Sequence, residues 1–126
     1  MREILKVLIV EDDNLLNKMY YDALVRAGYE VLVEFNGEKG LKSIIKNKPD
    51  LILLDLLMPK MNGFQVLEKM KQNPEVNDIP VIILTNYGEI ENVAKTVEMG
   101  VSGFNIKSEI TPDQVVDKVK NILSKK

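Results

Sequence analysis

Four acidic side chains stand directly after two aliphatic runs of the sequence, and together they could bind a metal ion or react with a phosphoryl group. Glu11, Asp12 and Asp13 follow the run VLIV, and Asp55 follows the run LILL. An ionised carboxylate at the tip of a buried strand is costly to desolvate unless a partner holds it. Carboxylates that lie close together also raise each other's pKa unless a cation intervenes. An all-oxygen cluster of this kind suits a hard ion, and we expect Mg²⁺.

Two further polar residues stand at the ends of other aliphatic segments. Thr85 follows the run VIIL, and Lys107 follows the segment GFNI. Ligands of an open α/β sheet bind at the carboxyl ends of its strands, so all of these side chains are expected to meet at one edge. A metal site with few protein carboxylates and free water positions would leave room for a phosphoryl oxygen.

Taken singly, each of these residues has an ordinary structural explanation. Asp13 is a favourable N-cap for a helix that begins beside it, and Thr85 is common in strands. Asp55 could form a turn, Glu11 could be a solvated acid, and Lys107 could be a surface lysine. The functional interpretation is preferred because residues from four strand ends agree.

Five segments predict the strands of a parallel sheet. Three are unbroken aliphatic runs (Val7–Val10, Leu51–Leu54 and Val81–Leu84), which are typical of parallel strands covered on both faces. The segment Tyr29–Phe35 alternates polar and apolar residues and predicts an edge strand, and Gly103–Lys107 is a weaker fifth strand. Segments with helical periodicity separate them. The pattern predicts an α/β fold of five βα units around an open, doubly wound sheet.

Capping residues mark the ends of the predicted helices. Gly28 ends the first helix, and the last begins at an N-cap Thr111 followed by Pro112. Methionines on helical stripes, such as Met19 and Met70, are expected to fill the core. The stripe of the first helix that is expected to face the core comprises Leu15, Leu16, Met19, Tyr20, Ala23, Leu24 and Ala27.

The loop after Asp55 has two residues with special backbone properties. Pro59 restricts the loop, and Gly63 is expected to permit a backbone turn that other residues cannot adopt. Both residues are expected to shape this loop.

The composition excludes several kinds of chemistry. The 126 residues contain no His and no Cys, which excludes a Ser-His-Asp triad, a thiolate metal site and a disulfide framework. The net charge of −2 gives no indication of nucleic acid as a partner. No segment has the features of a signal peptide or a membrane span, so we expect a soluble, cytoplasmic domain without a membrane partner.

The chain resembles the receiver domain of two-component response regulators over essentially its whole length. The motifs that carry the resemblance are VLIVEDD, LILLDLLMPKMNGF, VIILTN and GFNIK, which occur in the right order and at the right strand ends. The resemblance implies a flavodoxin-like sheet with the strand order 2-1-3-4-5. We expect residues 1–126 to form a single receiver domain with no output domain.

The resemblance implies a site for each matching position. It implies phosphorylation at Asp55 and a Mg²⁺ site formed by Glu11, Asp12, Asp55 and the backbone carbonyl of Leu57. The implied donor is the phosphohistidine of a sensor histidine kinase or of a phosphotransfer protein. The chain would therefore be a signalling phosphoacceptor that catalyses its own phosphorylation and dephosphorylation, and not a conventional enzyme.

A conformational switch is also implied by the resemblance. It assigns phosphoryl contacts to Thr85 and Lys107, and switching roles to Thr85 and Phe104. Thr85 is expected to move toward the phosphate while Phe104 turns inward, which repacks the surface of the fourth helix, fifth strand and fifth helix. This surface would signal to a downstream protein, with the chain a monomer or a phosphorylation-dependent dimer.

Several positions differ from the family pattern. Ser108 follows Lys107 where the family usually has Pro, and Asn86 stands where it usually has Ala or Gly. Leu57 and Tyr87 occupy positions that tune hydrolysis of the acyl phosphate in the family. We predict that an apolar and a bulky residue there hinder water and lengthen the phosphorylated lifetime.

Three other functions were weighed against the receiver interpretation. A haloacid-dehalogenase-type phosphohydrolase also uses an aspartate and Mg²⁺, but its Asp-x-Asp pair follows the first strand, where this chain has Glu11, Asp12 and Asp13. A receiver-like interaction module that is never phosphorylated would keep the fold with a relic acidic rim, and the complete residue set argues against it. A flavodoxin-like cofactor binder would need a phosphate-binding loop after the first strand, and none is present.

Overall fold

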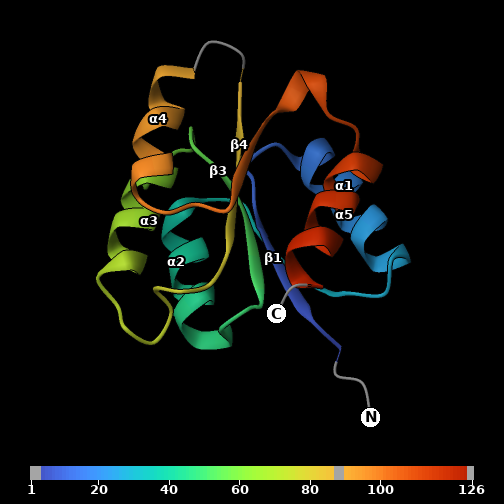
Figure 1. The fold of residues 1–126 in the computed structure, drawn as a ribbon, viewed down its shortest axis with the longest axis horizontal. Coiled ribbons are helices and arrows are strands. Elements are labelled where there is room, and N and C mark those ends of the chain that lie inside the picture. The colour runs from blue at the N-terminus through green and yellow to red at the C-terminus, as the bar shows by residue number, and fades with distance from the viewer. Residues whose placement is uncertain (1–3, 87–89, 125–126) are drawn as a thin grey trace.

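The computed structural model describes residues 4–86 and 90–124, and it shows strands and helices in strict alternation (Figure 1). A short 3₁₀ helix over Lys107–Glu109 precedes the last helix. The strands are β1 (Lys6–Val10), β2 (Glu30–Glu34), β3 (Leu51–Asp55), β4 (Val81–Thr85) and β5 (Gly103–Ile106). The helices are α1 (Asn14–Arg26), α2 (Gly37–Asn47), α3 (Gly63–Lys71), α4 (Ile90–Glu98) and α5 (Pro112–Leu123).

The five strands form one parallel sheet in the order β2-β1-β3-β4-β5. This confirms the predicted fold class and the predicted edge position of β2. Because β1, β3, β4 and β5 run in the same direction, their carboxyl ends lie at one edge of the sheet. The polar residues that follow these strands are therefore brought to a common place.

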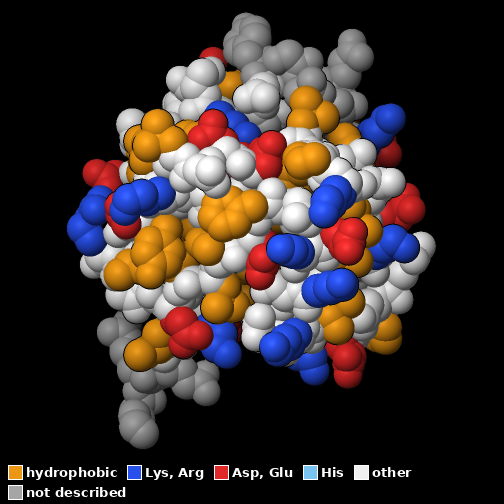
Figure 2. All heavy atoms as spheres, turned by 180° about the vertical axis from the view of Figure 1, so that it is seen from behind, with side chains coloured by type: hydrophobic (Ala, Val, Ile, Leu, Met, Phe, Trp, Pro, Cys, Tyr) orange, Lys and Arg blue, Asp and Glu red, His pale blue; other side chains and the backbone are white. Residues whose placement is uncertain are grey.

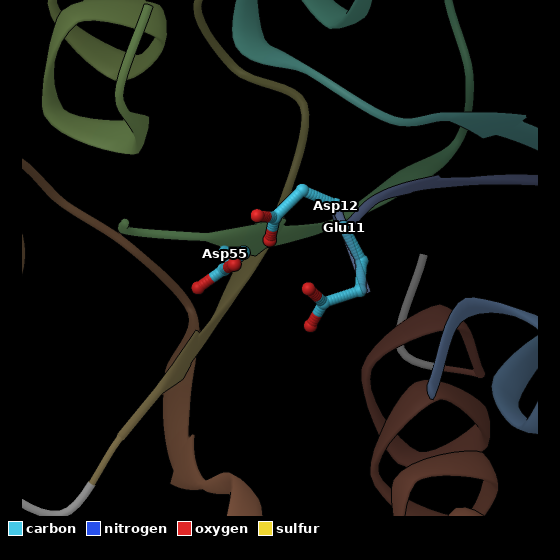
Figure 3. A group of neighbouring side chains, drawn as sticks. All are labelled: Glu11, Asp12 and Asp55. Carbon is cyan, nitrogen blue, oxygen red and sulfur yellow. The ribbon is translucent and has the colours of Figure 1, made fainter. Parts of the chain in front are cut away.

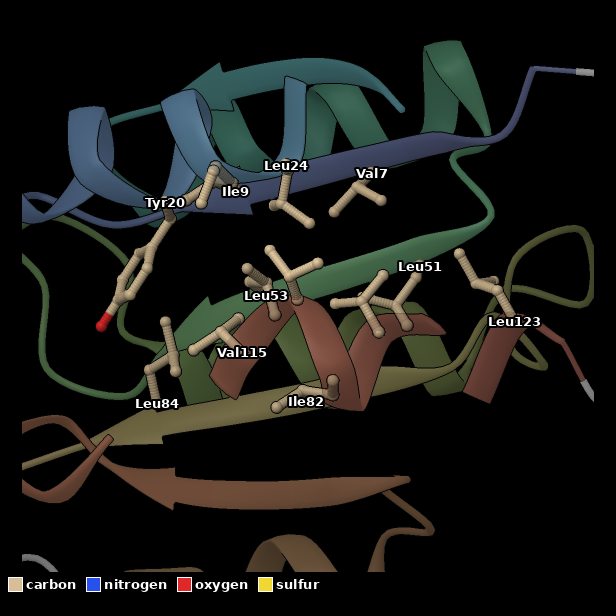
Figure 4. Packing of buried hydrophobic residues seen from close by; sticks show 13 residues of the cluster. Val7, Ile9, Tyr20, Leu24, Leu51, Leu53, Ile82, Leu84, Val115 and Leu123 are labelled. Carbon is tan, nitrogen blue, oxygen red and sulfur yellow. The ribbon is translucent and has the colours of Figure 1, made fainter. Parts of the chain in front are cut away.

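Helices cover both faces of the sheet, with α1 and α5 on one side and α2, α3 and α4 on the other (Figure 1). Alternate residues of β1, β3 and β4 supply two separate cores, as the period of two requires. Between the sheet and α1/α5, for example, Leu53 of β3 packs in one cluster with Leu24 and Val115 (Figure 4). Leu54, its neighbour in sequence, belongs to the other cluster, with Ile44 of α2.

The predicted stripe of α1 is partly wrong. Leu15 is 69% exposed and Met19 is 42% exposed, so neither belongs to the core. The buried face is centred on Asn17 and Tyr20 and continues through Ala23 and Leu24. Asn17 is tolerated there because its side-chain amide donates to the backbone carbonyl oxygens of Glu11 (3.0 Å) and Glu34 (3.4 Å).

The helix boundaries follow the predicted caps. The Thr111 hydroxyl accepts from the Gln114 N–H (3.2 Å), and the Gln114 side chain accepts from the Thr111 N–H (2.9 Å), so α5 begins with a complete capping box. Gly28 follows α1 with a φ of 99°.

Met70 is fully buried, as expected. Within the described part of the chain, no helix has the length and apolar character needed to cross a bilayer.

The loop between β3 and α3 differs from its prediction. The left-handed conformation falls on Lys60, which has a φ of 70°, and not on Gly63. Glycine is required at Gly63 for a different reason, since a Cβ there would overlap the carbonyl oxygen of Asp55 and approach Leu56 Cα to 2.8 Å. The N–H of Gly63 donates to the carbonyl of Leu56 (2.9 Å). This close approach holds the start of α3 against the end of β3.

Candidate active site at the carboxyl edge of the sheet

Three carboxylates converge at the ends of β1 and β3 (Figure 3). Glu11 and Asp12 follow β1, and Asp55 is the last residue of β3; one oxygen from each lies within 4.8 Å of the others. Glu11 and Asp55 are buried, whereas Asp12 is exposed. The structure therefore brings together the acidic residues that the sequence analysis placed at this edge.

Lys107 lies between the two buried carboxylates. Its Nζ is 2.6 Å from Glu11 Oε1 and 3.1 Å from Asp55 Oδ2. Lys107 begins the 3₁₀ helix after β5, and none of the described peptide bonds is cis, so the Lys107–Ser108 bond is trans. The serine that replaces the family's proline thus still allows the ammonium to reach the cluster.

The pKa of one carboxyl in the site differs strongly from its ordinary value. The pKa of Asp55 is raised from 3.8 to about 8, first by burial and then by the charge of Glu11, and Lys107 only partly opposes these two effects. Burial alone would lower the pKa of Lys107, but its close contact with Glu11 and the charges of Asp55 and Glu11 outweigh this, and the pKa is raised. Burial and the neighbouring charge of Glu11 therefore favour the neutral form of Asp55 in the metal-free protein.

Glu11 is fixed by the start of α1. Its Oε2 accepts from the backbone N–H of Asp13 (3.0 Å). The Asp13 carboxylate accepts in turn from the N–H of Leu16 (3.0 Å) as the N-cap of α1, which confirms the predicted cap. Asn17 binds the Glu11 carbonyl from the next turn of the helix. The buried acid is therefore held from several directions before any ligand arrives.

A pocket of about 540 Å³ opens over the cluster. The Leu57 N–H, beside it, donates to Asp55 Oδ1 (3.3 Å), which places the residue whose carbonyl was predicted as a metal ligand next to the acid. Asn86 and Ser108, the two departures from the family pattern, both face this space. The residues that line it are Asp12, Asp13, Leu16, Asp55, Leu57, Asn86, Lys107 and Ser108.

Two residues of the expected switch lie apart from the pocket. Thr85 is buried at the end of β4, and its hydroxyl donates to the carbonyl of Asn86 (3.3 Å) and does not line the pocket. Phe104 is 42% exposed and borders a separate groove of about 480 Å³ between β5 and α5. Tyr87 lies outside the described residues.

The residues at this edge fit a hard divalent cation. All of the side-chain ligands in the cluster are oxygens, and two of them are buried carboxylates beside a single contacting ammonium. The pKa of Asp55 is raised first by its burial and then by the nearby charge of Glu11, and both effects penalise a second buried carboxylate. A cation of the Mg²⁺ type would remove that penalty.

Two buried residues near the site were not recognised from the sequence. Asn17 holds Glu11 as described above, and the Tyr20 hydroxyl is buried beside the cluster without a hydrogen-bond partner. Asn17 was left out of the predicted core stripe because it is polar, whereas Tyr20 was assigned to that stripe as an apolar filler. An Asn at i and a Tyr at i+3, both on the helix that starts after the acidic pair, are the features that could have indicated them.

Known proteins with similar sequences are response regulators. A family model described as the response regulator receiver domain matches residues 7–120. The phosphate regulon transcriptional regulatory protein PhoB of Pseudomonas aeruginosa is 35% identical over 117 residues, which cover 93% of this chain and 51% of that protein. A probable transcriptional regulator, ycf29, of Pyropia yezoensis is 31% identical over 95% of this chain and 54% of its own length. The chain thus spans about half the length of the curated relatives it matches.

Solved structures agree in fold over nearly the whole chain. A crystal structure of a putative response regulator from Chloroflexus aurantiacus has 34% identity and a TM-score of 0.88, and the match covers 97% of this chain and 99% of that one. The chemotaxis response regulator CheY4 of Vibrio cholerae has 26% identity and a TM-score of 0.86, with coverage of 95% and 99%. With the family model, these likenesses show that the chain belongs to the receiver domains of two-component response regulators.

Proposed function

We propose that the chain accepts a phosphoryl group on Asp55 from the phosphohistidine of a sensor histidine kinase or phosphotransfer protein. The observation that carries the proposal is the pair of contacts that Lys107 makes with Glu11 and Asp55 at the end of the buried sheet. An Asp55 oxygen would attack phosphorus as the bond to the histidine nitrogen breaks. A carboxylate needs no base for this attack, which agrees with the absence of His from the chain.

Glu11, Asp12, Asp55 and the Leu57 carbonyl would hold Mg²⁺. When bound, the ion would supply positive charge that offsets the charge of the phosphoryl oxygens. The protein's own part is to keep Asp55 in place: its Oδ1 accepts from the Leu57 N–H (3.3 Å), while Oδ2 faces Lys107. The nucleophile is thus oriented before the donor binds.

Lys107 and Thr85 would contact the transferred group. Lys107 is already at the cluster and would exchange a carboxylate for a phosphoryl oxygen. Thr85 would turn its hydroxyl from the Asn86 carbonyl toward the phosphoryl group, and Phe104, now largely at the surface, would move inward. The repacking of α4, β5 and α5 would carry the signal to a downstream protein.

We further propose that the domain is a cytoplasmic phosphoacceptor that catalyses its own phosphorylation and dephosphorylation, with residues 1–126 as its single receiver domain. Its partners would be proteins. The face in Figure 2 mixes basic and acidic side chains, which is not the one-signed surface typical of nucleic-acid binding. The net charge of −2 agrees with this.

Intact mass spectrometry after incubation with acetyl phosphate tests the proposal. The parent protein is expected to gain one phosphoryl group only when Mg²⁺ is present, and Asp55→Asn is expected to gain none. Asp13→Asn, which alters a neighbouring acid outside the proposed set, is expected to react like the parent. A parent that stays unmodified while it binds Mg²⁺ would instead favour an interaction module that is not phosphorylated.

A further inference from the structure

The active-site end of the molecule contains a buried hydrogen-bond donor without a partner. Among the described residues, three buried side-chain polar atoms make no hydrogen bond: Glu11 Oε1, the Tyr20 hydroxyl and Asn105 Nδ2. Glu11 Oε1 is contacted by the Lys107 ammonium as an ion pair, whereas the Tyr20 hydroxyl has no such contact. Tyr20 is 1% exposed, so water does not replace the missing partner at the surface. A buried orphan hydroxyl is destabilising unless another state of the protein uses it.

Tyr20 lies on the same buried face of α1 as Asn17, which contacts Glu11. Asn17, three residues earlier on the same face of α1, donates to the Glu11 carbonyl (3.0 Å). Figure 4 shows Tyr20 at the carboxyl end of the strands, with its ring extending from α1 into the layer below the helix. Burial raises the pKa of Tyr20, and Glu11 contributes the strongest effect of any charged group. The phenol therefore stays protonated and can donate.

We propose that the Tyr20 hydroxyl replaces Lys107 as the partner of Glu11 when Lys107 turns to a phosphoryl group on Asp55. This inference rests on the proposed function, because it needs Lys107 to leave one of its two carboxylates. Without a replacement, Glu11 Oε1 would lose the ammonium and have no hydrogen-bond donor beside it, which is costly for a buried charged group even when Glu11 also contacts the proposed Mg²⁺. Tyr20 is then a positioning residue that favours the phosphorylated state and leaves the chemistry to Asp55.

The proposed exchange of partners at Glu11 predicts that Tyr20→Phe affects the unphosphorylated and the phosphorylated state in different ways. Tyr20→Phe removes a hydroxyl that makes no hydrogen bond in the unphosphorylated protein, so that state should be at least as resistant to urea as the parent. The activated state should lose a hydrogen bond to a charged group. A residue with a merely structural role would weaken both states together.

Beryllium fluoride with saturating Mg²⁺ is a suitable probe, because it forms a stable phosphoryl-like adduct on a carboxylate. We would titrate it into the parent, Tyr20→Phe and Tyr29→Phe, following the bound fluoride by ¹⁹F NMR, and measure urea unfolding of each protein without the probe. Tyr29 is a matched control, because it precedes β2 and lies at the opposite end of the strands. Tyrosine labelled with ¹³C at Cζ would report the state of the Tyr20 hydroxyl directly.

The expected result is a roughly tenfold weaker affinity for the probe in Tyr20→Phe, unchanged affinity in Tyr29→Phe, and no loss of urea resistance in Tyr20→Phe. The Tyr20 Cζ signal of the parent should also shift when the probe binds. Equal affinities in parent and Tyr20→Phe would overturn the inference, as would a parallel loss of stability and affinity. If the parent itself binds no probe, the proposed function fails first, and that result is seen before any Tyr20 comparison.

Discussion

At the scale of single residues, the site is a balance between burial, which favours neutral carboxyls, and Lys107, which favours charged ones. Asp55 is almost fully buried and lies beside Glu11, yet the ammonium is 3.1 Å from Asp55 Oδ2. The balance is incomplete, and the pKa of Asp55 stays raised. A site of this kind is sensitive to any added cation or anion.

The raised pKa of Asp55 predicts how the stability of the metal-free protein depends on pH. A group with a higher pKa in the folded state contributes stability that is full below its unfolded pKa of 3.8 and is lost as the pH rises through about 8. The unfolding free energy of the parent should therefore fall from pH 4 to pH 8 by about 2 kcal/mol or more relative to Asp55→Asn. Lys107 stays charged throughout this range, because its own pKa is raised.

Urea unfolding of both proteins in a chelating buffer at several pH values would measure the difference. Addition of Mg²⁺ at pH 8 should restore most of the lost stability in the parent and little in Asp55→Asn. Identical pH profiles for the two proteins would contradict the account of Asp55.

Two adjacent acids, Asp12 and Asp13, should separate metal binding from helix capping. Asp12 is exposed and belongs to the carboxylate cluster, so Asp12→Asn should weaken Mg²⁺ binding about tenfold or more with little loss of stability. Asp13 caps α1, so Asp13→Ala should cost about 1 kcal/mol and leave Mg²⁺ affinity unchanged. The readout is the increase in urea midpoint with Mg²⁺ concentration. Equal losses of affinity in the two variants would show that the cluster does not bind the ion as proposed.

The sequence predicted the charged residues of the site better than the neutral ones. The charged residues were found because they stand at the ends of aliphatic strands, where burying a charge is costly. They are Glu11, Asp55 and Lys107. Asn17 and Tyr20 lie on a helix, where a polar atom at a core position gives no signal until the neighbouring strand ends are placed. Their roles depend on how α1 is rotated about its axis.

At the scale of elements, the loop from β3 to α3 holds the acceptor strand by close contact. The Gly63 N–H binds the Leu56 carbonyl, and the Asn62–Gln65 capping box begins α3 beside it. A side chain at Gly63 would collide with the backbone at Asp55 and Leu56. The start of α3 thus sets the position of the strand end.

Gly63→Ala should therefore disturb both stability and the site. The backbone must shift to admit the methyl group, and we expect a loss of about 1–3 kcal/mol together with slower modification by acetyl phosphate. Gly103→Ala is the matched control, because a Cβ there meets no atom within 4 Å and its φ is not in the left-handed region. Urea unfolding and intact mass would be compared for both. A Gly63→Ala variant as stable and reactive as Gly103→Ala would refute the close-packing argument.

Element types were more predictable than the orientation of individual helices or loops. The order of strands and helices followed from aliphatic runs, helical spacing and caps such as Thr111. The buried face of α1 did not, since Leu15 and Met19 share the helical spacing but point to solvent. Gly63 was predicted to permit a special backbone turn, but the position needs glycine because it has no room for a Cβ. Such a close approach of two backbone segments cannot be recognised from the local sequence.

At the scale of the whole molecule, the two cores keep the sheet rigid while the reactive residues occupy its rim. Strand interiors such as Leu53 and Leu54 are fully buried on opposite faces, and each such side chain contributes about 1.5–3 kcal/mol to folding. The ends of β1, β3 and β5 are thus fixed relative to one another.

The measurement that tests the central claim most directly is chemical identification of the modified residue. The parent would be incubated with acetyl phosphate and Mg²⁺, the acyl phosphate reduced with borohydride, and the digested protein mapped by mass spectrometry. We predict that homoserine appears at Asp55 alone and that omission of Mg²⁺ abolishes it. Homoserine at Asp12 or Asp13, or no reduced product in a protein that gains phosphoryl mass, would contradict the assignment of Asp55 as the acceptor.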